Sequence, residues 1–198
     1  MNLYGPVRAV VAPPIRAFWR LEVEGAAHVP AGPVIVVANH DSLSDPFFLG
    51  AALERPVRFL AKRELWRNGA AGWVLDGLGG IPVDRSRGDV GAVAAVAQAL
   101  ERGAAVAIFP QGTVLGPADR PWQRGAARLA LTTGAPLVPV AIVGSDDVLR
   151  PGTRLPRRTP VKVVIGGAIA VERTSPTIPA TRELTARLRE TVEALRAS

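Results

Sequence analysis

The residues with the clearest chemical potential are a histidine and an aspartate five positions apart, in the segment Asn39-His40-Asp41-Ser42-Leu43-Ser44-Asp45. A carboxylate beside an imidazole sets the tautomer of the ring and favours the imidazolium that forms when the ring takes a proton. Such a pair is suited to general-base removal of a proton from a hydroxyl group. We therefore take His40 and Asp45 as the candidate catalytic residues.

The spacing of this pair constrains the local structure. On one regular helix, side chains five residues apart point about 140° away from each other and do not meet. They can meet if His40 lies in a strand-to-helix turn and Asp45 opens the helix, and Pro46 favours this break because proline suits the first helical turn. The alternative is that Asp45 only caps the helix and that His40 is an ordinary turn residue.

The elements that must position the pair follow from hydrophobic periodicity. Runs of β-branched residues bounded by turn signals predict strands at 34–38, 57–61, 80–83, 104–109, 137–143 and 161–165. Helical patterns predict helices at 46–54, 72–78, 89–102, 124–133 and 181–197. This alternation predicts an α/β fold, a single domain with a mostly parallel central sheet flanked by helices. His40 then follows the carboxyl end of a strand, where such sheets bind their ligands.

We expect an N-terminal segment over residues 1–22 and the main domain over residues 23–198. Residues 3–20 alternate apolar residues with arginines, and Pro13 and Pro14 are expected to break the stretch. This pattern fits a short interfacial amphipathic segment or, equally, a helix packed on the domain. No stretch of 18 uninterrupted apolar residues is present, so we expect no spanning helix, and the N-terminus shows no cleavable signal pattern.

Composition narrows the classes of partner. The chain has 198 residues, of which 48% are hydrophobic, which excludes disorder as the bulk state. It has no cysteine and only two histidines, so we expect neither a cofactor nor a metal site. The net charge is +7, and all cations except Lys62 and Lys162 are arginine, which points to an anionic partner. The arginines are spread along the chain without aromatic interleaving, so we expect no nucleic acid.

Further segments join His40 and Asp45 in a recognisable order. Residues 79–85 read Gly-Gly-Ile-Pro-Val-Asp-Arg, residues 109–113 read Phe-Pro-Gln-Gly-Thr, and residues 138–140 read Val-Pro-Val. With the Asn-His-x4-Asp segment, these resemble the four ordered motifs of the glycerolipid (lysophospholipid) acyltransferase family, typified by 1-acylglycerol-3-phosphate acyltransferases. The resemblance runs from about residue 24 to residue 145.

The resemblance implies a role for each matching position. His40 would deprotonate the acceptor hydroxyl and Asp45 would orient it, so that the alkoxide attacks the thioester of acyl-CoA or acyl-carrier protein without an acyl-enzyme. Arg85 would bind the acceptor phosphate, which a guanidinium can grip bidentately, although a surface arginine is the alternative. Gly112 and Thr113 would let backbone and hydroxyl approach the acceptor, or would simply form a turn.

The third motif departs from the family pattern Phe-Pro-Glu-Gly-Thr-Arg. Gln111 stands where the family has glutamate, and Val114 where it has arginine. Gln111 can still form hydrogen bonds but has no charge, and Val114 removes a cation that could bind phosphate. Arg87, Arg120 and Arg124 are nearby substitutes, and we include Gln111 and Arg124 among the candidate substrate-binding residues. The acceptor could be lysophosphatidic acid, another lysophospholipid or a different lipid alcohol.

The fourth motif and the charge complete the expected partners. Pro139 lies in the motif that the family links to acyl-donor binding, and a purely structural core strand is the alternative. We expect acyl-CoA or acyl-carrier protein as donor, a lysophospholipid as acceptor and an anionic membrane surface as partner. The resulting prediction is an O-acyltransferase of phospholipid biosynthesis, peripheral on the cytoplasmic face of the cell membrane. A catalytically inactive, lipid-binding member of the same fold is the rival hypothesis.

Overall fold

The structure, a computed structural model, describes residues 4–67, 69, 72, 75–76, 79–83, 90–114, 120–149 and 155–198. Its helices are α1 (Tyr4–Phe18), α2 (Asp45–Ala52), α4 (Val90–Glu101), α5 (Gly125–Thr133) and α6 (Ile178–Arg196), with 3-10 turns at Ala26–His28, Arg63–Arg67 and Ser145–Asp147. Its strands are β1 (Glu22–Glu24), β2 (Val34–Ala38), β3 (Val57–Lys62), β4 (Ile81–Val83), β5 (Ala105–Ile108), β6 (Leu137–Val143) and β7 (Lys162–Ile165).

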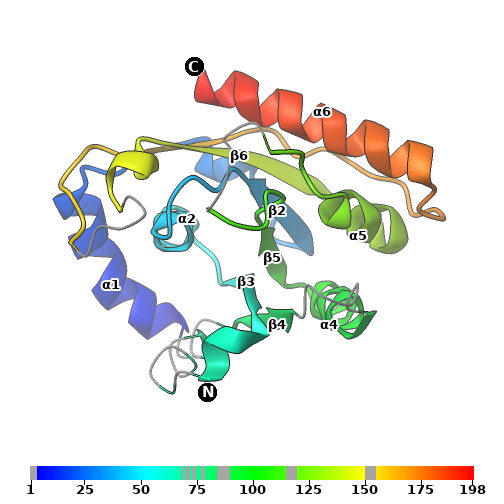
Figure 1. Cartoon of the computed structure of the whole chain (residues 1–198), viewed down its shortest axis with the longest axis horizontal. Coiled ribbons are helices and arrows are strands. Elements are labelled where there is room, and N and C mark those ends of the chain that lie inside the picture. Colours follow the sequence, from blue (N-terminus) through cyan, green and yellow to red (C-terminus); the bar gives the residue numbers. More distant parts are fainter. Residues whose placement is uncertain are drawn as a thin grey trace.

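The strands form one seven-stranded sheet in the order β1-β7-β6-β2-β5-β3-β4, of which Figure 1 labels the strands from β6 to β4. Every neighbouring pair is parallel except β6 and β7, which run antiparallel. This confirms the predicted α/β fold with a mostly parallel sheet. β2 lies at the centre, between β6 and β5, and all five of its residues are buried. A strand covered on both faces reads as a continuous apolar run, as Val34–Ala38 does.

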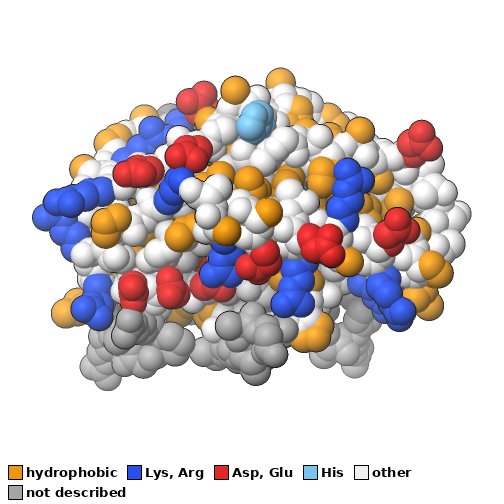
Figure 2. Space-filling view, turned by 90° about the horizontal axis from the view of Figure 1, so that it is seen from above, with side chains coloured by type: hydrophobic (Ala, Val, Ile, Leu, Met, Phe, Trp, Pro, Cys, Tyr) orange, Lys and Arg blue, Asp and Glu red, His pale blue; other side chains and the backbone are white. Residues whose placement is uncertain are grey.

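Helices cover both faces of the sheet (Figure 1). Val34, Val36 and Ala38 of β2 point to the face covered by α1 and α2, where Phe48 and Leu49 fill the core. The intervening residues Ile35 and Val37 point to the other face, which α4, α5 and α6 cover. The alternation of side chains along a strand thus feeds two separate apolar cores. Seen from the α6 side, the surface mixes basic and acidic side chains rather than gathering one sign (Figure 2).

The N-terminal helix differs from the sequence prediction. Pro13 and Pro14 were expected to break it, yet both lie inside α1, which continues to Phe18. Each proline removes one backbone donor, and packing of the last turns offsets that loss. Arg16 donates from Nε (3.2 Å) and from its terminal nitrogen (2.9 Å) to the carbonyl of Ala51 in α2. Trp19 makes an edge contact with the buried ring of Phe48, with ring centroids 5.5 Å apart.

The C-terminal half of α1 is therefore a helix packed on the domain, one of the two interpretations of this segment. Its exposed face remains apolar, with Val10 74% and Phe18 45% exposed. The division into residues 1–22 and 23–198 stays a prediction. None of the helices within the described ranges combines the length and the apolar character needed to cross a membrane.

Most predicted elements are present, with shifted ends. α2 begins at Asp45 and ends at Ala52, and α6 begins at Ile178, three residues before the predicted start. Thr177 caps α6, because its side-chain oxygen accepts from the amide of Ala180 (3.3 Å). The edge strand β1 was not predicted. The helix expected over 72–78 falls largely outside the described residues.

Candidate active site

The loop that carries the candidate base leaves the carboxyl end of β2 and is anchored by Asn39. The wholly buried amide of Asn39 donates to the carbonyl of Ile142 (2.8 Å) and accepts from the amide of Ile142 (2.7 Å). Ile142 lies in β6, which is the neighbour of β2 in the sheet. This pair of hydrogen bonds fixes the first residue of the loop to the sheet, so the next residue, His40, has a defined starting position.

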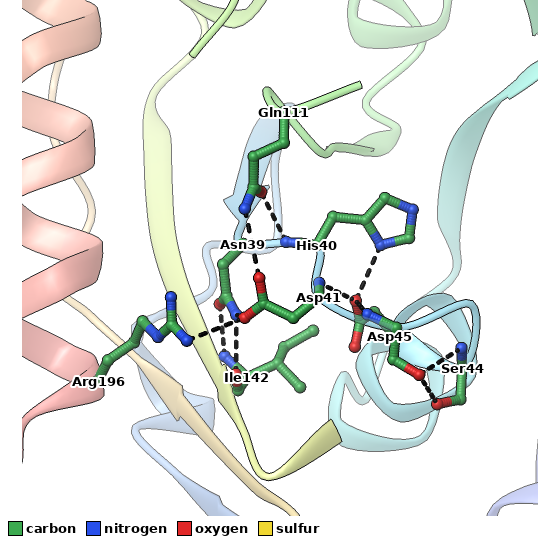
Figure 3. Close-up of polar contacts among 9 residues, drawn as sticks. Asn39, His40, Asp41, Ser44, Asp45, Gln111, Ile142 and Arg196 are labelled. Carbon is green, nitrogen blue, oxygen red and sulfur yellow. Dashed lines mark hydrogen bonds and ion pairs between the residues drawn. The ribbon is translucent and has the colours of Figure 1, made fainter. Parts of the chain in front are cut away.

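His40 and Asp45 meet in the geometry that the spacing required. Nδ1 of His40 lies 2.8 Å from Oδ2 of Asp45, with His40 in the turn and Asp45 as the first residue of α2 (Figure 3). The same oxygen of Asp45 accepts from the backbone amides of Asp41 and Ser42, both at 2.8 Å. Asp45 is wholly buried, whereas the side chain of His40 is 15% exposed. The carboxylate therefore both holds the turn and orients the ring.

The ring of His40 is also fixed from the side by aromatic packing. It stacks on Phe109 with centroids 4.3 Å apart, and Phe109 in turn stacks on Phe59 at 6.4 Å. An oxygen of Asp45 at Nδ1 places the ring proton on that nitrogen, since the carboxylate can only accept. Nε2 then carries the lone pair and is the atom that can take a proton from a bound hydroxyl.

The loop of the third motif contacts His40 from the backbone side. Oε1 of Gln111 accepts from the backbone amide of His40 (2.6 Å), and Nε2 of Gln111 faces Oδ1 of Asp41 at 3.4 Å (Figure 3). Gly112 follows with a φ of 73°, a conformation that favours glycine. Its amide donates to the carbonyl of Phe109 (3.0 Å), which closes the turn, and Thr113 beside it is half-buried. The structure thus brings Gln111 and its loop into direct contact with the backbone of His40.

Asp41 and Arg196 belong to the same group, and the sequence prediction missed both. Oδ2 of Asp41 accepts from Nδ2 of Asn39 (2.8 Å) and from a terminal nitrogen of Arg196 (3.0 Å). Arg196 ends α6, which packs on the face of the sheet opposite to α2, and its side chain extends to Asp41 in this loop (Figure 3). Asp41 could have been noticed because it stands inside the first motif. No local pattern marks Arg196, since its partner lies near the other end of the chain.

The remaining predicted substrate-binding residues lie apart from this group or outside the description. Arg124 is exposed and precedes α5, and no hydrogen bond or ion pair between described residues joins it to His40. Pro139 is buried in β6 opposite Val37, and its carbonyl accepts from the amide of Gly166 (2.9 Å). Pro139 therefore has a clear place in the sheet, and its part in donor binding stays a prediction. Arg85 lies outside the described residues.

The titratable side chains of the site do not form a metal centre within the described ranges. No three of the histidines, aspartates and glutamates described there lie close enough together to hold a metal ion. What the site does hold is an imidazole whose Nδ1 contacts a buried carboxylate and whose Nε2 has no hydrogen-bond partner among the residues that the structure describes. This arrangement can perform general-base chemistry on a hydroxyl. The fold and the site together define an α/β protein whose candidate general base, His40, contacts a buried aspartate at the carboxyl edge of the sheet.

Comparisons with known proteins show the family of this chain. The family model described as acyltransferase matches residues 20–143. The 1-acyl-sn-glycerol-3-phosphate acyltransferase of Bacillus subtilis is 32% identical over 148 residues, which cover 74% of this chain and 72% of that protein. The enzyme of the same name from Pseudomonas aeruginosa is 32% identical over 161 residues, 79% of this chain and 62% of that protein. The chain belongs to the acyltransferase family.

Two further comparisons concern the length of the chain beside its relatives and its fold. The chain spans 42% of the chloroplastic 1-acyl-sn-glycerol-3-phosphate acyltransferase BAT2 of Brassica napus, with 28% identity over 148 residues that cover 70% of this chain. The crystal structure of the 1-acyl-sn-glycerophosphate acyltransferase PlsC from Thermotoga maritima superposes with a TM-score of 0.74 at 24% identity. That superposition covers 98% of this chain and 83% of the Thermotoga protein, which shows that the two share a fold.

Proposed function

We propose that this chain transfers a fatty acyl group from acyl-CoA or acyl-carrier protein to the free hydroxyl of a lysophospholipid, foremost 1-acylglycerol-3-phosphate. His40 is the general base and Asp45 orients it. The observation that carries the proposal is the 2.8 Å contact between Nδ1 of His40 and the wholly buried carboxylate of Asp45. The names of the relatives supply the substrate class.

In the proposed reaction, Nε2 of His40 takes the proton of the acceptor hydroxyl as its oxygen attacks the thioester carbonyl carbon. The carbon–sulfur bond then breaks, and the thiolate leaves and receives that proton from His40. The buried charge of Asp45 stabilises the transient imidazolium. No side chain forms a covalent intermediate, which agrees with a chain that has no cysteine.

Turnover is tested by free-thiol release from palmitoyl-CoA in the presence of lysophosphatidic acid. We expect His40→Ala to lower kcat at least about 100-fold, the size of a general-base contribution. His28→Gln is the matched control, since it changes the only other histidine, which is exposed. Wild-type release without any lysolipid, or full release by His40→Ala, would contradict the proposal. Repeating the assay with acyl-carrier protein as donor separates an inactive protein from one with a different donor.

The acceptor class is proposed from the second motif. Arg85 supplies the cation that the family motif places there, and a lysolipid panel tests it. We expect Arg85→Ala to raise the KM for lysophosphatidic acid about tenfold or more, because a guanidinium–phosphate pair is a strong, often bidentate contact. An unchanged KM would favour the alternative of a neutral lipid alcohol as acceptor.

We also propose that the protein binds peripherally to an anionic membrane, namely the cytoplasmic face of the cell membrane. Support comes from an apolar pocket of about 260 Å³ between α1 and the His40 loop. Its lining includes Leu43 and Phe47, which are 59% and 50% exposed although they flank the base. Arg158 lies over the exposed ring of Phe18, 5.7 Å from its centroid, so cations border the apolar surface.

Membrane binding is tested by pelleting with vesicles that contain phosphatidylglycerol. We expect Val10→Glu to weaken pelleting by about tenfold, since it places a charge on the apolar face of α1. Ile178→Glu is the matched control, because Ile178 is 64% exposed but lies at the start of α6. Equal loss in both variants would show that this face of α1 has no special part in binding.

A further inference from the structure

The carboxylate of Asp41 collects donors from three separate parts of the chain (Figure 3). Asn39 donates to it from the same loop (2.8 Å), Gln111 faces it from the third motif (3.4 Å), and Arg196 pairs with it from the end of α6 (3.0 Å). The side chain of Asp41 is 19% exposed and that of Arg196 36%. An ion pair that is partly shielded from water and joined to other hydrogen bonds stabilises the structure more than an isolated surface pair does.

The orientation of the Gln111 amide is dictated by its neighbours. The backbone amide of His40 can only donate, so the oxygen of Gln111 must face it, at 2.6 Å. The NH2 group of Gln111 is thereby turned toward Asp41, which can only accept. Gln111 is 7% exposed, so water cannot easily replace either contact. An amide satisfies both partners at this position, whereas an ionised carboxylate could satisfy only the amide of His40.

A glutamate at position 111 would be in conflict with this arrangement. It could still accept from the amide of His40, but it would set a second carboxylate against Asp41. Two close carboxylates with little solvent repel each other, and neither could donate to the other. The departure of the third motif from Phe-Pro-Glu-Gly-Thr-Arg is thus matched by the aspartate that follows His40, and Arg196 supplies the cation for that aspartate.

We propose that Gln111, Asp41 and Arg196 act as one positioning unit for His40, and this inference rests on the proposed role of His40 as the base. Gln111 holds the backbone of His40 and Asp41 holds Gln111. Arg196 neutralises Asp41 and ties the loop to α6. The unit does not touch the reacting atoms. Its effect is to keep Nε2 of His40 where the acceptor hydroxyl binds.

The first test is a charge exchange between positions 41 and 111. We expect Gln111→Glu to lower kcat about 10- to 100-fold with KM changed less than threefold, because small misplacements of a catalytic group have effects of that size. The double variant Asp41→Asn with Gln111→Glu restores the donor–acceptor match in reverse and should recover kcat to within about fivefold of wild type. A Gln111→Glu protein with full kcat, or a double variant no better than the single one, would overturn the proposal.

The second test removes the cation. We expect Arg196→Met to lower kcat about tenfold, Arg196→Lys to retain most activity, and Arg187→Met, an exposed arginine on the same helix, to have no effect. In the Asp41→Asn background, Arg196→Met should add less than a twofold loss, since the carboxylate in the His40 loop is already neutral and the second partner of Arg196, Glu193 (3.6 Å), lies on α6 itself. An effect of Arg196→Met on KM alone, or an equal loss in both backgrounds, would refute the positioning role.

Thermal unfolding of the same variants keeps the two proposals distinguishable. The unit predicts that the changes at positions 41 and 111 are non-additive in the unfolding midpoint, whether or not the chain turns over substrate. Full activity of His40→Ala together with this non-additivity would refute the base and leave the contact network standing. Additive midpoints would refute the network itself.

Discussion

Replacing Asp45 by asparagine separates the two things that this carboxylate does, which are to hold the turn and to provide negative charge. One oxygen of Asp45 accepts from Nδ1 of His40 and from the amides of Asp41 and Ser42, all at 2.8 Å. Asparagine has one oxygen and one NH2 group. The two backbone amides can only donate, so they select the amide oxygen for that position. The NH2 group then occupies the place of Oδ1, which is buried and has no hydrogen-bond partner among the described residues.

The magnitude follows from this orientation. Because the oxygen still faces Nδ1, the tautomer of His40 is retained and only the charge beside the imidazolium is lost. A charge pair at about 4 Å is worth about 4 kcal/mol at an effective dielectric constant of 20. If about half of the charge has formed on the ring in the transition state, the barrier rises by about 2 kcal/mol, which lowers kcat about 30-fold. An aspartate-to-asparagine change that reverses the tautomer costs about 10⁴-fold in serine proteases.

The assay is free-thiol release from palmitoyl-CoA at saturating lysolipid, beside thermal unfolding. The buried, unsatisfied NH2 group should lower stability by about 1 to 3 kcal/mol and the midpoint by about 2 to 12 °C, which thermal unfolding measures directly. A loss near 10⁴-fold in folded protein would show that the backbone amides do not control the side chain. A loss below threefold would show that the charge of Asp45 has no part in turnover.

Two further predictions concern the frame that holds the site. Gly25→Ala should unfold the β1 edge and lower stability by more than about 3 kcal/mol, because φ is 73° and a Cβ would lie 2.1 Å from the carbonyl oxygen of Ile165. Gly32→Ala is the control, since its Cβ would meet nothing within 4 Å. Equal unfolding midpoints of the two variants would refute this prediction. Arg55→Met should lower stability by about 2 to 4 kcal/mol, since the guanidinium donates to three backbone carbonyls, those of Pro30, Gly32 and Gly103. Burial lowers the pKa of Arg55, yet arginine stays protonated in proteins, so this contribution should be constant from pH 5 to pH 9 in denaturant titrations, and a loss within that range would contradict it.

The elements at the centre of the sheet were predictable because local chemistry determines them. The β-branched run of β2 between turn signals is typical of a buried strand, and Gly103 and Gly134, which follow the ends of α4 and α5, adopt φ values of 79° and 74°. The meeting of His40 with Asp45 was open to prediction for a similar reason, since Pro46 favours a helix that begins close to Asp45, although a cap-only role for Asp45 was the alternative. These inferences use residues within a few positions of one another.

The features that the sequence prediction missed have a common cause, because each depends on contacts between distant parts of the chain. α1 continues through Pro13 and Pro14, and its later turns pack on α2, which sequence periodicity does not reveal. β1 exists because residues 22–24 pair with residues 162–164 of β7, and three residues have no strand signal of their own. Arg196 reaches Asp41 only because α6 crosses the sheet to the loop after β2. Each of these features depends on tertiary packing that overrides or supplements local preference.

The departure of the third motif at Gln111 is matched by charged residues that lie outside that motif. In the sequence, glutamine for glutamate and valine for arginine suggest a site that has lost its charges. In the structure, Asp41 carries a carboxylate beside Gln111, and Arg196 pairs with it at 3.0 Å. A carboxylate and a cation thus lie beside His40, supplied by the next residue, Asp41, and by Arg196 at the end of α6. Because Arg196 pairs with Asp41 and with Glu193, the cation proposed for an acceptor phosphate is a different one, Arg85 of the second motif, and the KM of Arg85→Ala tests that proposal.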